Sequence, residues 1–366
     1  MGSEVIVMHS NSGATVSVVG GGVIGLACAW RAAQAGWHVT LHDPAVGSGA
    51  SHVAGGMLAP LSEGWPGEEA ALAVGAASLD RWPGFGGELE RASGLSLFTT
   101  TDSLTVALDA ADAEDLHTIA EFLGRAGRTA RVLTRREVRE HEPMLARGIR
   151  LGLLTDGESA VDNRALLTAL RGAAADAGVE IRGEQVADLD ALESDRVVLA
   201  AGHASARLWP GLQVRPVKGE ILRLRARPGV TPAPTRTVRG VVHGRPAYLV
   251  PRADGIVVGA TQLEAGEDTQ VTVAGVRDLV ADAEALMPAI GEYEFHEAAA
   301  GLRPCSPDNI PIVGAVSDRV VVATGHGRNG ILMTPVTADA VVAALAGDEL
   351  PEMAPASPTR FAVPAR

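Results

Sequence analysis

The segment 16–43, VSVVGGGVIGLACAWRAAQAGWHVTLHD, constrains the fold of this chain more than any other part of the sequence. It contains an apolar strand-like run, a turn with Gly20, Gly22 and Gly25 in G-x-G-x-x-G spacing, a run of helix-forming residues and a second strand-like run that ends at Asp43. In this context the first glycine permits a tight turn, the second lets the backbone approach a pyrophosphate, and the third packs the helix on the strand. The helix N-terminus then attracts phosphate groups. The segment predicts a βαβ unit that binds a dinucleotide, with a glycine-rich turn that holds no ligand as the alternative.

The identity of the dinucleotide needs further evidence, because the fingerprint does not distinguish NAD from FAD. Asp43 follows Gly25 by 18 residues (43 − 25) and can accept hydrogen bonds from an adenosine ribose. The next segment, GSGASHVAGGMLAP at 47–60, consists largely of small residues without helical periodicity, where an NAD dehydrogenase would have an ordinary helix. Small residues let a backbone approach a flat ligand, and Ser51 can bond a phosphate or ribityl oxygen. This run favours FAD, with a plain surface loop as the alternative.

Two later segments repeat the plan of a strand followed by a glycine-containing turn. They are DRVVLAAGHASA at 195–206 and RVVVATGHGRNGILMTP at 319–335, and the second leads into a helix expected at about 334–345. Three strand ends that meet one ligand suit a long dinucleotide lying across a sheet.

Composition bounds the remaining possibilities. A chain of 366 residues with 46% hydrophobic residues can form two interlocked domains around large cores. A net charge of −13 argues against nucleic acid and anionic membranes as partners, and two cysteines do not make a disulfide framework.

The sequence has neither an apolar run of about 18 residues nor a signal peptide, so a cytoplasmic location is expected. Histidine spacing predicts no metal site. The oligomeric state stays open, with a homo-oligomer as one alternative.

Several motifs in order resemble one known family. They are VVGGGVIGLACAW, ASHVAGGMLAP, PVKGE, AYLVPR, VVGAT, GLRP and GHGRNGIL, spread over about residues 14–347. The chain resembles the FAD-dependent D-amino-acid oxidase superfamily, and most closely the glycine oxidases of thiamin biosynthesis. The resemblance implies FAD as cofactor, a small amino acid or amine as substrate and molecular oxygen as electron acceptor. It implies oxidative deamination by hydride transfer to flavin N5, which gives an imine or glyoxylate, ammonia and hydrogen peroxide, and which supplies dehydroglycine for the thiazole of thiamin.

The fold class implied is α/β with an antiparallel sheet: a Rossmann-like FAD-binding domain interleaved with a substrate domain. The expected FAD-binding portions are 14–90, 151–213 and 299–347, and the expected substrate portions are 91–150 and 214–298. Residues 1–13 are expected to form a flexible leader and residues 348–366 an extended C-terminal arm.

Three residues are expected to carry the chemistry. The guanidinium of Arg303 in GLRP can hold an amino-acid carboxylate through two parallel hydrogen bonds. The phenol of Tyr248 can bond the same carboxylate, and the resemblance places Arg328 near the flavin and the substrate amine or carbonyl. The structural alternatives are a surface arginine at 303, a core tyrosine at 248, and an arginine at 328 that only caps its turn or pairs with a neighbour. Met57 and Gln262 complete the predicted substrate contacts.

The predicted cofactor contacts come from the glycine-rich turn, the end of the second strand, the small-residue run, the middle of the chain at 186 and 202, and the late turn. They are Gly20, Gly22, Val23, Ile24, Gly25, Asp43, Ala50, Ser51, Gly55, Gly56, Met57, Val186, Gly202, His326, Gly327, Arg328, Asn329, Gly330, Ile331 and Leu332.

The chain departs from the family pattern at the substrate pocket. Gln262 stands where the aligned glycine oxidase has a methionine, and Gly327 replaces a bulky aromatic residue. Glycine, sarcosine and small D-amino acids therefore all remain candidate substrates. The rival hypotheses are a dehydrogenase of the same fold with another acceptor, a D-amino-acid or sarcosine oxidase, a flavin-holding interaction module without turnover, and an NAD-dependent dehydrogenase.

Overall fold

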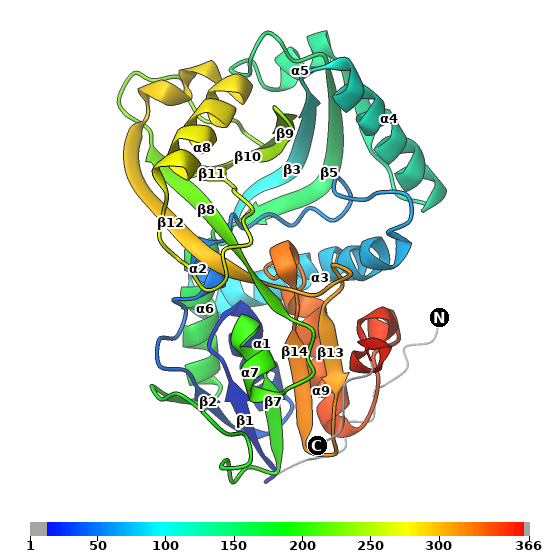
Figure 1. Ribbon diagram of the computed structural model, residues 1–366, viewed down its shortest axis with the longest axis vertical. Coiled ribbons are helices and arrows are strands. Elements are labelled where there is room, and N and C mark those ends of the chain that lie inside the picture. The colour runs from blue at the N-terminus through cyan, green and yellow to red at the C-terminus, as the bar shows by residue number, and fades with distance from the viewer. Residues whose placement is uncertain (1–12, 362–366) are drawn as a thin grey trace.

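Two sheets organise the chain in a computed structural model that describes residues 13–361 (Figure 1). The first sheet has six strands in the order β13-β14-β7-β1-β2-β6. Their bounds are β1 Thr15–Val19, β2 His38–His42, β6 Glu180–Arg182, β7 Arg196–Leu199, β13 Ile312–Ala315 and β14 Val320–Thr324. All neighbouring pairs are parallel except β13 with β14. This is the sheet that the glycine fingerprint predicts.

The second sheet has eight strands in the order β12-β8-β11-β10-β9-β3-β5-β4. Their bounds are β3 Phe98–Ala107, β4 Arg131–Thr134, β5 Leu151–Val161, β8 Arg215–Arg225, β9 Thr237–Val242, β10 Arg245–Arg252, β11 Gly255–Gly259 and β12 Glu294–Cys305. Neighbours run antiparallel except for β3 and β9, which run parallel. The chain crosses between the two sheets several times, so neither sheet is a continuous segment.

The helices cover both sheets. They are α1 Val23–Gln34, α2 Ala50–Val53, α3 Glu69–Ser93, α4 Ala110–Arg125, α5 Arg135–His141, α6 Asn163–Asp176, α7 Ser205–Leu208, α8 Val273–Leu286 and α9 Thr334–Ala346. In Figure 1, α3 lies between the two halves, with α4, α5 and α8 beside the eight-stranded sheet. Asp162 caps α6, as its position in the sequence predicts, by accepting hydrogen bonds from the backbone N–H groups of Arg164 and Ala165.

The fingerprint turn folds as the glycine spacing predicts. A Cβ at Gly25 would lie 1.8 Å from the carbonyl oxygen of Gly20, so only glycine lets α1 pack this close to the end of β1. Gly20 itself has a φ of +109°, a backbone conformation that residues other than glycine rarely adopt. The close crossing sets the N-terminus of α1 against the end of the parallel sheet.

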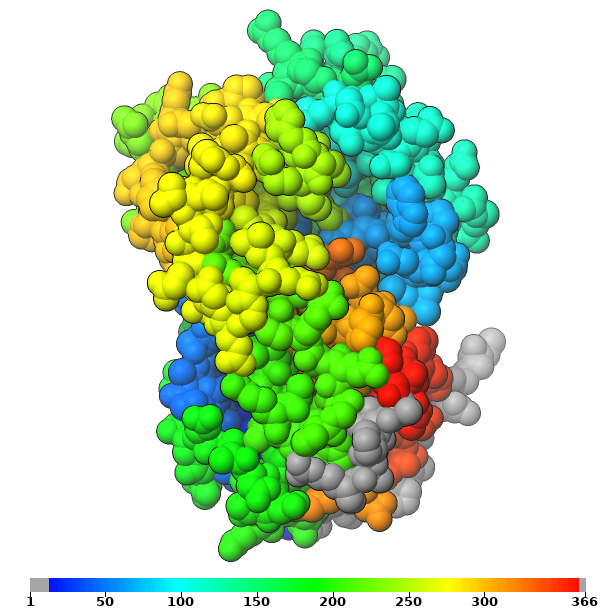
Figure 2. All heavy atoms as spheres, in the orientation of Figure 1, coloured from blue at the N-terminus to red at the C-terminus, as the bar shows by residue number. Residues whose placement is uncertain are grey.

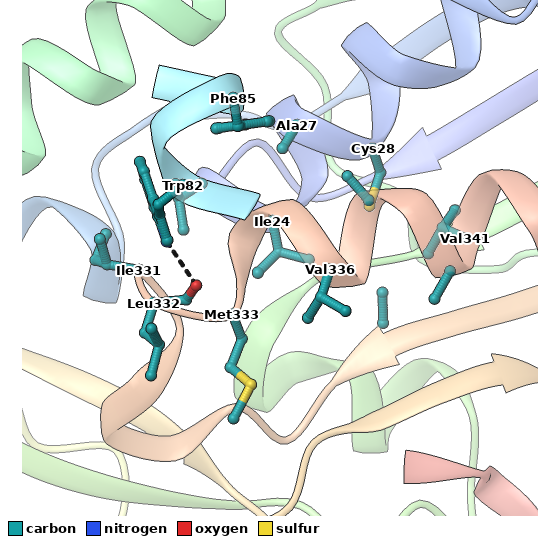
Figure 3. Close-up of a cluster of buried hydrophobic side chains, with 14 of the residues drawn as sticks. Ile24, Ala27, Cys28, Trp82, Phe85, Ile331, Leu332, Met333, Val336 and Val341 are labelled. Atoms are coloured by element: carbon teal, nitrogen blue, oxygen red, sulfur yellow. Dashed lines mark hydrogen bonds between the residues drawn. The ribbon is translucent and has the colours of Figure 1, made fainter. Parts of the chain in front are cut away.

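A core of apolar side chains from α1, α3 and α9 supports this turn (Figure 3). Trp82 and Phe85 of α3 pack beside Ile24 and Ala27 of α1. The indole Nε1 of Trp82 donates to the carbonyl oxygen of Leu332 at 2.8 Å. This bond fixes the chain between β14 and α9, which is the second glycine-rich turn that the sequence singles out.

The structure differs from the predicted organisation at four places. β5 pairs with β3 and β4 in the eight-stranded sheet, so the boundary expected at residue 151 cuts off a strand of that sheet. β12 pairs with β8 in the same sheet, so the boundary expected at residue 299 divides this strand and separates Arg303 from the substrate portion. The small-residue run includes a short helix, α2, where no helical periodicity is visible. The arm expected to be extended forms 3₁₀ turns at Pro351–Ala356 and Pro358–Phe361, because Met353 and Ala356 are buried against the core. Residues 1–12 of the expected leader and residues 362–366 of the expected arm lie outside the described residues.

Candidate active site

A cavity of about 1420 Å³ lies between the two sheets and is lined by residues of both. Its volume exceeds the roughly 300–1,000 Å³ of pockets that hold a drug-sized ligand, so it has room for a long cofactor and a small second molecule. The segment around residue 270, coloured yellow in Figure 2, lies over the junction of the two halves. One end of the cavity is formed by the fingerprint turn, and the other by the floor of the eight-stranded sheet.

The fingerprint end fits a dinucleotide. α1 has Gly22 as its N-cap without a side-chain hydrogen bond, and its first turn holds no acidic residue. No acidic side chain of its own first turn offsets the positive end of α1, and such a helix end attracts a pyrophosphate. A Cβ on Gly22 would approach the Oγ of Ser51 to 3.3 Å, so a side chain here would fill the space beside the turn.

Asp43 and Ser51 shape the same end through backbone contacts. The carboxylate of Asp43 accepts hydrogen bonds from the N–H groups of Gly21 at 2.6 Å and Ala45 at 2.7 Å. The hydroxyl of Ser51 accepts one from Val23 at 3.1 Å. Asp43 and Ser51 both line the cavity, so each can also reach a ligand there.

Nearly all the predicted cofactor and substrate contacts line this one cavity, with Gly25 and Leu332 as the exceptions. Gly25 is covered by the crossing of α1 over β1 and serves the packing role that the fingerprint assigns to it. Leu332 is buried in the core, and its carbonyl oxygen accepts from Trp82 and Ser78. Residues separated by more than 250 positions in the sequence thus line the same cavity.

Register explains how the eight-stranded sheet presents its functional side chains. Directly paired residues share a face of a sheet, and Tyr248 pairs with Arg239 on one side and Gly259 on the other. Gly219 pairs with Gly301, and Arg303 lies two positions further along β12 on the same face. The floor of the cavity therefore carries charged and phenolic groups separated by bare backbone.

Arg303 lies flat over the bare backbone of Gly219. A Cβ at Gly219 would lie 2.3 Å from both Nη atoms of Arg303, so a side chain there would displace the guanidinium. The Nη1 atom donates to the carbonyl oxygen of Thr261 at 3.1 Å. Because this is the single hydrogen bond found for the Arg303 guanidinium within residues 13–361, further donors remain for a ligand.

Tyr248 fills the space above two glycines in the same way. A Cβ at Gly259 would lie 2.2 Å from its hydroxyl oxygen, and one at Gly55 would lie 2.9 Å from its ring. Burial raises the pKa of the Tyr248 phenol, against the lowering effect of Arg303. The phenol is therefore protonated at neutral pH and can donate a hydrogen bond.

Arg328 has a partner that the sequence analysis missed. Its Nε donates to Glu63 Oε2 at 2.6 Å, and Arg239 Nη2 donates to Glu63 Oε1 at 2.6 Å. All three residues line the cavity. Nothing local marks Glu63 or Arg239 as functional, since each is a lone charged residue in its own segment. The one available signal is the position of Glu63 just after the small-residue run.

His326 fastens the late turn to α9. It is buried, and its Nε2 lies 3.0 Å from the hydroxyl oxygen of Thr337. Burial lowers the pKa of His326 to about 3, so the imidazole is neutral at physiological pH. This geometry suits the orienting role expected for His326.

A buried polar cluster holds the loop that carries Gln262. The Nζ of Lys218 donates to Asp268 at 2.7 Å, and Glu220 accepts from the N–H of Thr272 at 2.9 Å. The hydrogen bond to Asp268 raises the pKa of Lys218, which stays charged. The Thr261 N–H also donates to the carbonyl oxygen of Glu220 at 3.2 Å, so both ends of the loop from Thr261 to Thr272 are fixed. Gln262 lines the cavity from this loop.

The described residues contain no sign of two other kinds of site. Within residues 13–361, no three His, Cys, Asp or Glu side chains come together in a way that could hold a metal ion. Across the same residues, none of the helices combines the length and apolar character needed to cross a membrane.

Comparison with known proteins identifies the family. Residues 15–344 match the model of the DAO family, described as FAD dependent oxidoreductase. The chain belongs to this family. The predictions of a DAO-type fold and of FAD as cofactor are thereby confirmed.

Individual relatives of this FAD-dependent oxidoreductase agree with the family match. The bifunctional protein ThiO/ThiG of Synechocystis sp. is 33% identical over 344 residues, which cover 88% of this chain and 50% of that protein. The chain thus spans about half the length of that relative. The glycine oxidase of Pseudomonas putida is 32% identical over 362 residues, covering 91% of this chain and 95% of that protein. The crystal structure of glycine oxidase from Geobacillus kaustophilus superposes with a TM-score of 0.86 at 31% identity, covering 94% of this chain and 98% of that chain.

Proposed function

We propose that this oxidoreductase catalyses the oxidative deamination of a small amino acid or amine, with glycine as the first candidate and sarcosine and small D-amino acids as the others. The substrate loses a hydride from Cα and a proton from nitrogen to become an imine, which water converts to glyoxylate and ammonia when glycine is the substrate. FAD, when bound, accepts the hydride and passes the two electrons to molecular oxygen, which forms hydrogen peroxide. The relatives named glycine oxidase and ThiO support this choice of reaction.

The observation that carries the proposal is the guanidinium of Arg303 on the cavity floor. It lies over Gly219 and is half-buried, with donors left for a planar carboxylate. The protonated phenol of Tyr248 lies on the same face of the sheet and donates to the same carboxylate. These two groups fix the acid end of a small zwitterion, so that its Cα is held in one orientation.

The remaining residues have supporting roles in this proposal. Arg328 lies beside the end of the substrate that carries the substrate's amine or carbonyl group. Gln262 and Met57 line the substrate space. The turn from His326 to Ile331 and the fingerprint turn hold the cofactor. The imine product, dehydroglycine, supplies the thiazole of thiamin in this proposal, because the Synechocystis relative joins ThiO to ThiG in one protein.

One experiment tests the reaction directly. The purified, FAD-loaded protein is mixed anaerobically with glycine, sarcosine or D-alanine while its visible spectrum is recorded, and oxygen is then admitted with a peroxide assay. Loss of the flavin absorbance near neutral pH followed by peroxide release is the expected result. A spectrum that none of the three amines changes would contradict the proposal. Bleaching without peroxide in air would favour the alternative of a dehydrogenase with another acceptor.

The role of Arg303 has its own test. Arg303→Ala removes a charge-assisted pair with the substrate carboxylate, which is worth about 2–5 kcal/mol, so we expect KM for glycine to rise by about 30-fold or more. The turnover of bound substrate should fall much less. Steady-state kinetics at matched FAD content measure both parameters, with Arg303→Lys as the variant that keeps the charge. Equal falls in kcat and kcat/KM for every substrate, with KM unchanged, would exclude a carboxylate-binding role.

A further inference from the structure

Three guanidinium groups surround the substrate end of the cavity, although a small amino acid has only one carboxylate. They belong to Arg303, Arg239 and Arg328. The charges of Arg303 and Arg239 both act on the Tyr248 hydroxyl, and those of Arg303 and Arg328 both act on the Cys305 thiol. A carboxylate that enters this space could bind to any of the three. Only one of these choices gives the orientation that the reaction needs.

Glu63 already pairs with two of the three groups, and its negative charge offsets part of theirs. Its Oε1 accepts from Arg239 Nη2 and its Oε2 from Arg328 Nε, each at 2.6 Å. The Glu63 side chain is 10% exposed, and Arg239 is further fixed by a 2.9 Å hydrogen bond to the Ser62 hydroxyl. Burial acts to raise the pKa of Glu63, but Arg239 and Arg328 outweigh it and hold the pKa below its ordinary value. The carboxylate is therefore ionised across the neutral range.

A second buried carboxylate, that of Glu158, holds the backbone just before Glu63. Glu158 accepts hydrogen bonds from the N–H groups of Leu61 and Ser62, and from the hydroxyl of Ser103. The turn that carries Glu63 is thus anchored to β3 and β5 of the eight-stranded sheet. Glu63 meets Arg239 from β9 and Arg328 from the turn before α9, so it joins three separate segments. Its position does not depend on a bound substrate.

We propose that Glu63 is a specificity-determining positioning residue: its carboxylate occupies Arg239 and Arg328, so that Arg303 alone receives the carboxylate of the substrate. The ligand class recognised at Arg303 is then a small zwitterion bound in one orientation. Without the charge of Glu63, the two freed guanidiniums compete for the substrate carboxylate and hold the molecule in an unproductive orientation. This inference rests on the proposed function, in which Arg303 binds the acid end.

The test compares Glu63→Gln with the parent protein, using acetate as an unreactive probe and glycine as substrate. Acetate binding is measured on FAD-loaded protein by the change in visible absorbance and, independently, by the shift in melting temperature. Glu63→Gln is expected to bind acetate about 5-fold more tightly, because two guanidiniums lose their partner. Its kcat and KM for glycine should fall together, which is the signature of unproductive binding.

Two further variants serve as controls. Glu63→Asp keeps the charge and is expected to return the acetate dissociation constant to within about twofold of the parent. Arg239→Gln removes one guanidinium and leaves Glu63 paired with Arg328, so it should not tighten acetate binding. If Glu63→Gln folds poorly, the double variant Glu63→Gln/Arg239→Gln replaces it, and tighter acetate binding than in Arg239→Gln alone supports the proposal.

The outcomes that overturn the inference are specific. Acetate binding that is unchanged or weaker in Glu63→Gln, or in the double variant against Arg239→Gln, shows that Glu63 does not block the two arginines. A higher KM with unchanged kcat shows that Glu63 contributes ordinary substrate affinity instead. The acetate comparison requires no turnover. A parent protein that oxidises none of the small amines would therefore overturn the proposed function and leave the test of Glu63 intact.

Discussion

At the scale of single residues, the chemistry of this site depends on glycines that lie beneath the functional side chains. Arg303 and Tyr248 occupy space that exists because Gly219 and Gly259 have no Cβ. Neither glycine has a positive φ, so a left-handed backbone conformation is not the reason for them. The reason is the close approach of a guanidinium and a phenol to the sheet.

Gly259→Ala tests this dependence. The new Cβ would lie 2.2 Å from the Tyr248 hydroxyl oxygen, so the ring must move away from its place on the floor. We expect kcat/KM for the small amine to fall by about 10-fold or more, as when a substrate-binding group is misplaced by about 1 Å. Gly84→Ala in α3 is the matched control, because nothing lies within 4 Å of its Cβ. That control should keep full activity and leave stability equal or up to about 1 kcal/mol higher. Equal kinetics in both variants would refute the packing argument.

At the scale of elements, two strand-turn-helix units bring their glycine-rich turns to the cavity. The first unit is β1, the fingerprint turn and α1, and the second is β14, the late turn and α9. In each, a close contact helps to hold the turn in place: Gly25 against Gly20 in the first, and His326 against Thr337 in the second. The two contacts lead to different predictions.

Gly25→Ala and Gly22→Ala should differ sharply in cofactor binding. A Cβ at Gly25 meets the Gly20 carbonyl oxygen at 1.8 Å, and backbone cannot give way without separating α1 from β1. At Gly22 the nearest atom is the hydroxyl oxygen of Ser51 at 3.3 Å, which can rotate aside. We expect Gly25→Ala to lose FAD or fail to fold, and Gly22→Ala to retain FAD with weaker affinity. Flavin content after gel filtration and far-UV circular dichroism measure both, and equal FAD content in the two variants would contradict this account.

His326 makes stability depend on pH in a definite direction. Its pKa in the folded protein is about 3, below the ordinary value of 6.5, so the unfolded chain binds a proton in this window that the folded chain does not. The stabilisation is fully present above pH 6.5 and is lost as the pH falls toward 3. The slope from this one group is at most about 1.4 kcal/mol per pH unit. Denaturant unfolding of the parent and His326→Gln at pH 7, 6 and 5 should show a smaller acid loss in the variant. If the variant lost as much stability as the parent between pH 7 and pH 5, or more, His326 would be excluded as a cause of the pH dependence.

At the scale of the whole molecule, the cavity is shared by two halves that the chain enters repeatedly. The fingerprint turn belongs to the six-stranded sheet, whereas Arg303 and Tyr248 belong to the eight-stranded sheet. A ligand that spans the cavity contacts both halves and therefore stabilises the folded molecule as a unit. This arrangement connects cofactor binding to global stability.

Added FAD should raise the melting temperature of cofactor-depleted protein. A ligand that binds only the folded state contributes about 2.7 kcal/mol when its concentration is 100 times its dissociation constant. We expect one cooperative transition that moves upward by several degrees as FAD is titrated, followed by differential scanning calorimetry. Adenosine monophosphate, which reaches the fingerprint end alone, is the control and should shift the transition less. Two separate transitions, or no dependence on FAD, would show that the halves do not share the ligand in this way.

The sequence alone was sufficient for those features that depend on neighbouring residues. Turn chemistry at Gly20 and Gly25, apolar runs of strand length and the cap at Asp162 are local patterns, and each element they predict is present. The resemblance of several ordered motifs also predicted the family and the cofactor, and residues such as Arg303 and Tyr248 line one cavity as expected. The two exceptions, Gly25 and Leu332, are held inside the packing that supports the turns.

Only the tertiary structure decided which charges meet. Glu63 lies 176 positions from Arg239 and 265 from Arg328, and no local pattern marks any of the three as partners. The pairing of β5 with the eight-stranded sheet and the buried 3₁₀ turns after residue 350 are of the same kind. Periodicity and turn chemistry act over a few residues, whereas ion pairs and strand neighbours depend on where the folded chain returns. The distribution of charge around the substrate is therefore a property of the fold and not of any one segment.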